Sequence, residues 1–75
     1  MRFNGNKLKA LLDEEVSKKT LTRAGFCREL YKQYGVTLSG NHLGRLERSM
    51  HIPGKPLREA ICAYFDKEEK FFIEL

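Results

Sequence analysis

Apolar residues recur at intervals of three and four along most of this 75-residue chain. This spacing places them on one face of an α-helix, which has 3.6 residues per turn. No segment alternates apolar and polar residues as a half-buried strand does, and no segment repeats another. Because a chain of this length can build only one small core, the pattern predicts a single all-α domain over residues 1–75 with five short helices.

Two of these helices are expected in the first half of the chain, at about 6–17 and 22–34. Thr22 can cap the second helix, because its hydroxyl accepts a hydrogen bond from a free N–H of the first turn. Gly35 is suited to end it, because glycine adopts the left-handed conformation that often closes a helix. The two apolar faces are Leu8, Leu11, Leu12 and Val16, then Phe26, Cys27, Leu30, Tyr31 and Tyr34.

Three further helices are expected in the second half. Ser39 can cap the third helix. A break that contains proline follows, and Pro56 is suited to the first position of the fourth helix. The apolar faces are Leu43, Leu46 and Met50 for the third helix, and Leu57, Ala60, Ile61, Tyr64 and Phe65 for the fourth.

The last helix is expected to be short, with a capping box that starts at Asp66 and includes Glu69. The residues that follow, Phe71, Phe72 and Leu75, are unusually apolar for a terminal segment. These side chains either dock onto the core or contribute to a dimer surface, since small domains often gain stability by association. Both alternatives are compatible with the sequence.

The outward face of the third helix carries Gly40, Asn41, Gly44, Arg45 and Arg48, and no acidic residue. In a DNA major groove, Arg can form two hydrogen bonds with guanine and Asn two with adenine. Glycine allows a partner's backbone to come close. The face is therefore compatible both with a helix that contacts nucleic acid bases and with an ordinary solvated surface, and the rest of the chain must distinguish them.

The charge distribution favours a polyanionic partner. Residues 1–58 carry 12 Lys and Arg against 5 Asp and Glu, whereas residues 59–75 carry 2 against 5. A basic body can neutralise phosphates along a duplex. No apolar run approaches the roughly 18 residues of a membrane span, and the start of the chain lacks the apolar core of a signal peptide. We therefore expect a cytoplasmic protein without a membrane partner.

Other chemistries have little support in the sequence. Cys27 and Cys62 lie far apart in apolar stretches, which predicts reduced core thiols and no disulfide. With His42 and His51 they lack the spacing of a zinc site. Neither histidine has a carboxylate or nucleophile at a catalytic spacing, and no glycine-rich phosphate loop is present. We therefore expect no enzyme activity, no metal and no cofactor.

Three motifs in order resemble the helix-turn-helix of the phage repressor and Cro family: L-T-R-A-G-F-C at 21–27, G-V-T at 35–37 and S-G-N-H-L-G-R-L-E-R at 39–48. The resemblance covers about residues 6–75. It implies a compact lambda-repressor-like domain of five helices, with the helix-turn-helix at about 22–49 in the second and third helices. It further implies a repressor-like transcriptional regulator of phage or mobile-element type that binds double-stranded DNA as a homodimer. Such a protein is bacterial or phage-encoded and associates with the nucleoid.

The resemblance also implies contact roles on the DNA. The base-facing positions match Asn41, Arg45, Gly40, His42 and Gly44, and the phosphate-contacting positions match Arg23, Arg48, Lys55, Thr22 and Ser39. Arg23, Asn41 and Arg45 are accordingly expected to be exposed.

Several features depart from the family pattern. Extra residues lengthen the step between the two motif helices, and Ser49 stands where glycine commonly follows the third helix. Gly40 has no side chain at a position that usually contacts a base. The family glutamate that matches Glu47 often pairs with an arginine of the first helix. This chain has no arginine between Arg2 and Arg23, so a lysine or another residue is expected to take that place.

A protein-interaction module, such as an antitoxin or antirepressor on the same fold, is the alternative, because a fold does not fix a function. Such a module would present apolar or aromatic anchors on the outward face of the third helix. That face instead carries Asn, Arg and Gly, which favours DNA binding.

Overall fold

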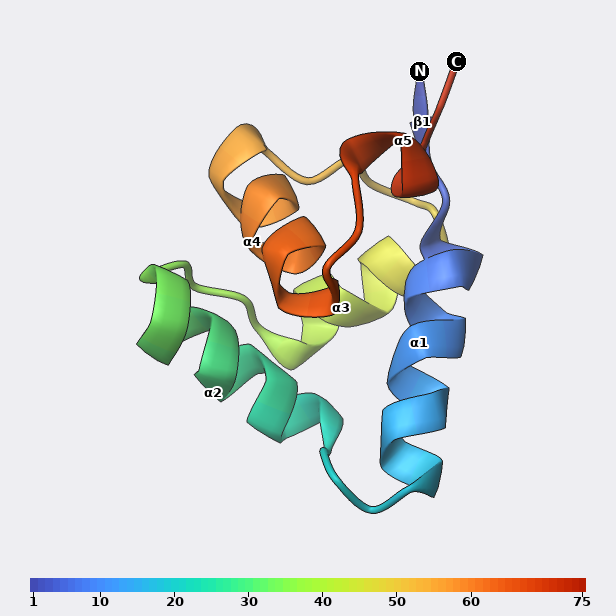
Figure 1. The fold of residues 1–75 in the computed structure, drawn as a ribbon. Coiled ribbons are helices and arrows are strands. Elements are labelled where there is room, and N and C mark those ends of the chain that lie inside the picture. Colours follow the sequence, from blue (N-terminus) through green and yellow to red (C-terminus); the bar gives the residue numbers. More distant parts are fainter.

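The computed structural model describes residues 1–75 and contains five helices and one two-stranded ribbon. The helices are α1 Gly5–Ser17, α2 Arg23–Tyr34, α3 Gly40–Glu47, α4 Lys55–Phe65 and α5 Glu69–Phe72. The strands are β1 Arg2–Phe3 and β2 Ile73–Glu74, which pair in antiparallel register. Figure 1 shows the two ends of the chain side by side, with α3 between α1 and α2. No helix is both long and apolar enough to cross a membrane.

The prediction of five helices is confirmed, and the prediction of a chain without strands is wrong. Each strand has two residues, which is too short for an alternating pattern to be recognised. The rings of Phe3 and Phe72 stack with centroids 5.4 Å apart, and Arg2 pairs with Glu74 at 3.3 Å. The N–H of Asn4 donates to the Phe72 carbonyl at 2.6 Å. These contacts fasten both ends of the chain to the helices.

The predicted boundaries of α2 and the predicted start of α3 are confirmed. Thr22 Oγ1 accepts from the Gly25 N–H at 3.0 Å, and Ser39 Oγ accepts from the His42 N–H at 3.1 Å. Gly35 ends α2 with φ of 69°, in the left-handed conformation that glycine adopts without a steric cost. The connection between α2 and α3 therefore spans residues 35–39.

The predicted capping box at the last helix is wrong. Asp66 ends α4 in the left-handed conformation, with φ of 54°, and does not start α5. The residue before α5 is Glu68, whose side chain forms no capping hydrogen bond. Aspartate tolerates the left-handed conformation better than most residues, which explains why α4 can stop there without glycine. Pro56 was predicted at the first position of the fourth helix, but α4 begins at Lys55, so Pro56 is its second residue and lies in the first turn.

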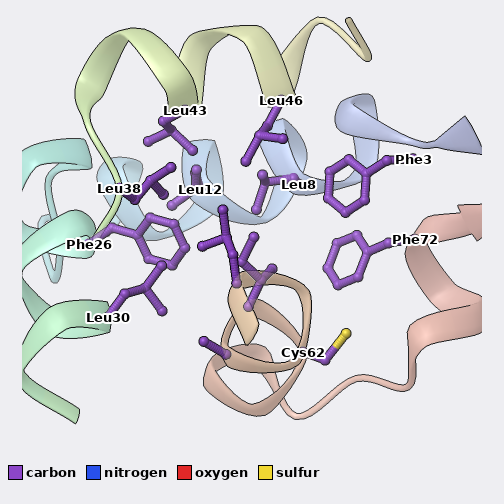
Figure 2. Close-up of a cluster of buried hydrophobic side chains, with 13 residues drawn as sticks. Phe3, Leu8, Leu12, Phe26, Leu30, Leu38, Leu43, Leu46, Cys62 and Phe72 are labelled. Carbon is purple, nitrogen blue, oxygen red and sulfur yellow. The ribbon is translucent and has the colours of Figure 1, made fainter. Parts of the chain in front are cut away.

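Buried side chains from all five helices form one core. Figure 2 shows Leu43 and Leu46 of α3 on the same side as Leu8 and Leu12 of α1, and the ring of Phe3 facing that of Phe72. The core residues are Phe3, Leu8, Leu12, Phe26, Leu30, Leu38, Leu43, Leu46, Leu57, Ala60, Ile61, Cys62 and Phe72. Because Leu43 and Leu46 are buried, the opposite face of α3 is left to solvent.

Four side chains that the spacing assigned to apolar faces lie at the surface. Tyr31 and Tyr34 are 65% and 40% exposed, because Leu30 is the last α2 residue buried in the core. Met50 is 68% exposed, because α3 ends at Glu47 and the chain turns before it. Val16 is exposed in the last turn of α1.

The apolar residues at the end of the chain were expected either to dock onto the core or to form a dimer surface. Phe72 is fully buried and Phe71 is partly buried against the core, so docking is confirmed for this pair. The amino groups of Lys7 and Lys67 each lie 4.9 Å from the centre of the Phe71 ring. Leu75 is fully exposed. A role of this end of the molecule in a dimer stays a prediction.

Candidate nucleic-acid interface

The side of α3 that faces away from the core carries exposed polar side chains without partners in the chain. Asn41 and Arg45 are exposed one turn apart, and Arg48 is exposed at the residue that ends the helix. None of these three side chains forms a hydrogen bond or an ion pair within the chain. Two guanidiniums and one amide are therefore available to an external partner, and Asn41 and Arg45 are exposed as predicted.

The two glycines of this face differ in their surroundings. A Cβ on Gly40 would meet no atom within 4 Å, so the surface beside Asn41 is open. A Cβ on Gly44 would lie 3.5 Å from Nη1 of Arg48, because that guanidinium folds back over the helix. The guanidinium of Arg48 thus lies against Gly44, whereas the surface at Gly40 is open to a partner.

A groove of about 450 Å³ separates the exposed face of α3 from α2. It opens beside Gly40 and Gly44, so a molecule that follows α3 also meets α2. The lining residues are Arg23, Ala24, Cys27 and Arg28 of α2, with Gly40, Leu43, Gly44 and Glu47 of α3.

Arg23 lines this groove and is half-buried, so the prediction that it is exposed is wrong. Its side chain is 37% exposed and pairs with the nearly buried carboxylate of Glu47, which is 10% exposed. Nε of Arg23 donates to Oε1 of Glu47 at 2.8 Å, and Nη2 donates to Oε2 at 3.1 Å. Nη2 also donates to Oδ1 of Asp13 at 2.6 Å. The guanidinium therefore joins α1, α2 and α3.

The two carboxylates of Asp13 and Glu47 stabilise the charged form of the Arg23 guanidinium that lies between them. Hydrogen bonds to Glu47 and then Asp13 raise the pKa of the Arg23 guanidinium, because both favour its charged form. Hydrogen bonds from Arg23 and then Lys9 lower the pKa of the Asp13 carboxyl. Nη1 is the one nitrogen of Arg23 without a partner, so the predicted phosphate contact of Arg23 depends on that atom.

The triad also identifies the partner of Glu47, which the sequence left as a lysine or another residue. The partner is Arg23, at the first position of α2 rather than in α1. The sequence places both residues at helix ends, because Arg23 directly follows the cap residue Thr22 and Glu47 is the last residue of α3. What the sequence does not show is that these two helix ends meet.

A second contact that the sequence missed joins the start of α1 to the end of α3. Ser49 adopts the left-handed conformation, with φ of 59°, and its Oγ accepts from the Gly5 N–H at 2.8 Å. A Cβ on Gly5 would lie only 1.8 Å from the Leu46 carbonyl oxygen. Ser49 therefore occupies a backbone conformation that favours glycine, and its hydroxyl adds a hydrogen bond that glycine lacks.

The remaining predicted site residues have varied surroundings. His42 is half-buried, and its ring meets that of His51 edge-on with centroids 4.9 Å apart. The hydroxyls of Thr22 and Ser39 serve as helix caps. Lys55 starts α4 and lies 3.8 Å from the Glu59 carboxylate. The structure thus places His42 on the same helix as Asn41 and Arg45, and Lys55 on a different helix.

Both cysteines are free thiols, Cys62 in the core and Cys27 half-buried beside the groove. Burial raises the pKa of each thiol, because a thiolate is disfavoured in apolar surroundings. We expect a thiol reagent to label the native protein much more slowly than the unfolded protein at pH 7. Labelling followed by mass spectrometry checks this, and equal rates in the two states would contradict it.

Cys27→Ala should be tolerated better than Cys27→Asp, which would bury a charge.

The exposed face of α3 and the adjoining groove are the surfaces that a functional proposal must explain. Comparisons of the chain with protein-family models, with curated proteins and with solved structures give no match. No group of three or more His, Cys, Asp and Glu side chains is placed to hold a metal ion. The function of these surfaces must therefore be inferred from the chemistry of their exposed residues.

Proposed function

We propose that this chain binds double-stranded DNA sequence-specifically through α3, as a lambda-repressor-like helix-turn-helix protein. The observation that carries the proposal is the exposed face of α3, where Asn41, Arg45 and Arg48 have no partner within the chain. An amide and two guanidiniums on a solvent-facing helix match the acceptors and donors of base edges and phosphates. The regulator would be repressor-like and of phage or mobile-element type, as the motif resemblance implies.

The charge pairing in the first three helices supports a polyanionic partner. Every acidic side chain of α1, α2 and α3 is engaged within the chain, whereas Arg45 and Arg48 are not. Asp13 forms ion pairs with Lys9 and Arg23, Glu14 with Lys18, and Glu47 with Arg23. Glu15 and Glu29 accept hydrogen bonds from the uncharged side chains of Thr20 and Gln33. Unpaired positive charge therefore remains on the face of α3 that a duplex would approach.

The arrangement suggests a division between reading bases and holding the backbone. With α3 in the major groove, Asn41 and Arg45 are one turn apart and would contact neighbouring base pairs. Arg48 would contact a phosphate at the end of the helix. A homodimer would place two such helices on half-sites about 34 Å apart, one turn of DNA.

The alternative of a protein-interaction module has less support on this face. Interface hot spots are enriched in large aromatic side chains within desolvated pockets. The exposed residues of α3 include no aromatic side chain apart from His42, which is half-buried against His51. The face would make polar and charged contacts, as expected for a nucleic acid partner.

Selection of bound duplexes from a random DNA pool tests the proposal directly. We expect a short motif to be enriched, and a homodimer would enrich it as two inverted half-sites. Recovery of unchanged random sequence together with affinity that does not respond to salt would contradict the proposal. The protein's mass in solution, with and without the selected duplex, tests the homodimer independently.

Arg45→Ala and Asn41→Ala are expected to reduce sequence discrimination rather than general binding. Each should cost about 1–3 kcal/mol on the selected duplex and much less on random DNA. Both side chains are exposed and unpaired, so the melting temperature should change little. Titrations of both duplexes, beside thermal unfolding, measure these effects. Lys70→Ala, an exposed change on α5, is the matched control, and an unchanged ratio between the duplexes for both α3 variants would exclude α3 as the reader.

A further inference from the structure

We propose that Met1, His42, Met50 and His51 form a binding site for a soft monovalent metal ion, copper(I). This inference does not depend on the proposed DNA binding. The chain contains two methionines and two histidines, and the fold brings all four to one place beside the end of α3. Their positions in the sequence follow no metal-ligand spacing, so the sequence alone predicted no metal.

The site lies where the start of the chain meets the connection that follows α3. Met1, Met50 and His51 line one hollow of about 490 Å³. The ring of His51 meets the ring of His42 on α3, with centroids 4.9 Å apart. A hydrogen bond from the first residue of α1 to Ser49 holds the two segments together. Two thioethers and two imidazoles from three separate segments are thus neighbours.

The separation of the two imidazoles fits a shared metal ion. When two imidazoles bind one ion at a metal–nitrogen distance of about 2.0 Å and a tetrahedral angle, their ring centres lie about 5 Å apart. The ring centres of His42 and His51 are 4.9 Å apart. The two rings therefore already have the separation that a common ion requires.

The donor atoms favour copper(I) over harder cations. Thioether sulfurs are soft ligands that select copper(I), and imidazole also binds copper. The other residues that line the hollow are Arg2, Phe3, Ser49 and Ile52, so the lining contains no carboxylate and no thiol. Calcium and magnesium prefer several oxygen ligands, which this hollow does not offer.

The surrounding charges favour a monovalent ion over a divalent one. Arg2 lines the hollow, and Arg45 lies three residues after His42 on α3. Repulsion between these cations and a metal ion doubles when the ion carries two charges instead of one. Arg2 also pairs with Glu74, whose Oε1 lies 3.3 Å from its Nε, and this pairing reduces the repulsion from that side.

The exposure of both methionines is the feature that packing does not explain. Met50 has the spacing of the apolar face of α3, yet it is 68% exposed, and Met1 is 71% exposed. An exposed thioether adds little to a core, and it is accessible to an ion from solvent. The alternative is a surface on which the two methionines have no ligand, and a metal titration distinguishes the two.

The test is a titration with copper(I), kept reduced by ascorbate without oxygen, in competition with a coloured copper(I) chelator. We expect one copper(I) ion per chain to bind at this site. Met50→Leu/His51→Gln keeps side-chain volume and removes two of the four donors. It should lower the affinity for copper(I) by about tenfold or more, since changes outside a ligand shell already cost about 10–100-fold. Equal affinity in the unaltered and double-variant proteins would overturn the proposal, as would no binding by the unaltered protein.

Cys27→Ala is the matched control, because thiolates also bind copper(I) and Cys27 is the less buried of the two thiols. The control should keep the affinity of the unaltered protein. If Cys27→Ala loses the bound ion and Met50→Leu/His51→Gln keeps it, the ligand is the cysteine and the proposed site is overturned.

Two further readouts separate binding at the site from an indirect effect of the substitutions. The methyl signals of Met1 and Met50 in nuclear magnetic resonance spectra should shift when copper(I) is added, and unshifted signals would show that the thioethers are not ligands. Copper(I) should raise the melting temperature of the unaltered protein more than that of Met50→Leu/His51→Gln, because an ion stabilises the folded state that binds it. Thermal unfolding without metal confirms that each variant is folded.

Discussion

Gly5→Ala is expected to destabilise the protein more than alanine at any of its other five glycines. The added Cβ would lie 1.8 Å from the Leu46 carbonyl oxygen and 2.6 Å from the Glu47 carbonyl carbon. These are backbone atoms of α3, so no side chain can rotate away. The first turn of α1 must move, and the hydrogen bond from the Gly5 N–H to Ser49 is lost with it.

The expected loss is about 3 kcal/mol or more, the upper range for an overpacked site whose neighbours cannot yield. For a domain of this size that lowers the melting temperature by more than about 10 °C. Thermal unfolding followed by circular dichroism measures it. Gly40→Ala is the matched control, because its Cβ would meet no atom within 4 Å. A Gly5→Ala protein that melts with the control would show that α1 and α3 are not in contact here.

The sequence predicted the helices well, because each helix carries its own local signals. Apolar residues at helical spacing marked the first four helices, and Thr22, Ser39 and Gly35 marked ends that the structure confirms. Errors arose where contacts with another part of the chain determine the local structure. Met50 was assigned to the third helix by spacing, but the left-handed Ser49 turns the chain away first. The ribbon of β1 and β2 pairs Arg2 with Glu74 and Phe3 with Ile73, at opposite ends of the chain, and no local pattern reveals that.

The candidate site divides in the same way. Exposure of Asn41 and Arg45 follows from the burial of Leu43 and Leu46 on the same helix, so periodicity was sufficient. The surroundings of Arg23 depend on where three helices meet, which periodicity along one helix cannot show. The sequence therefore predicted the exposed face of α3. It could not predict that Arg23 and Glu47 pair and so join α2 to α3.

Arg23→Ala is expected to have the second large effect on stability. It would leave the carboxylate of Glu47, which is 10% exposed, without either of its two hydrogen-bond donors. Removing one partner of a buried pair costs several kcal/mol, because the remaining charge stays desolvated. Since Arg23 itself is 37% exposed and water can enter its place, we expect a smaller loss of about 2–3 kcal/mol.

The double variant Arg23→Met/Glu47→Met separates the loss of the pair from the loss of a side chain. It removes both charges and keeps apolar volume, so it should be less destabilised than the sum of the two single variants. Asp13→Asn is the control, since Asp13 contacts the same guanidinium from the exposed side and should cost much less. Urea unfolding of the unaltered protein, Arg23→Met, Glu47→Met and the double variant gives the coupling between Arg23 and Glu47. Additive effects would show that the two residues act independently, and the end of α3 would then need another anchor to α2.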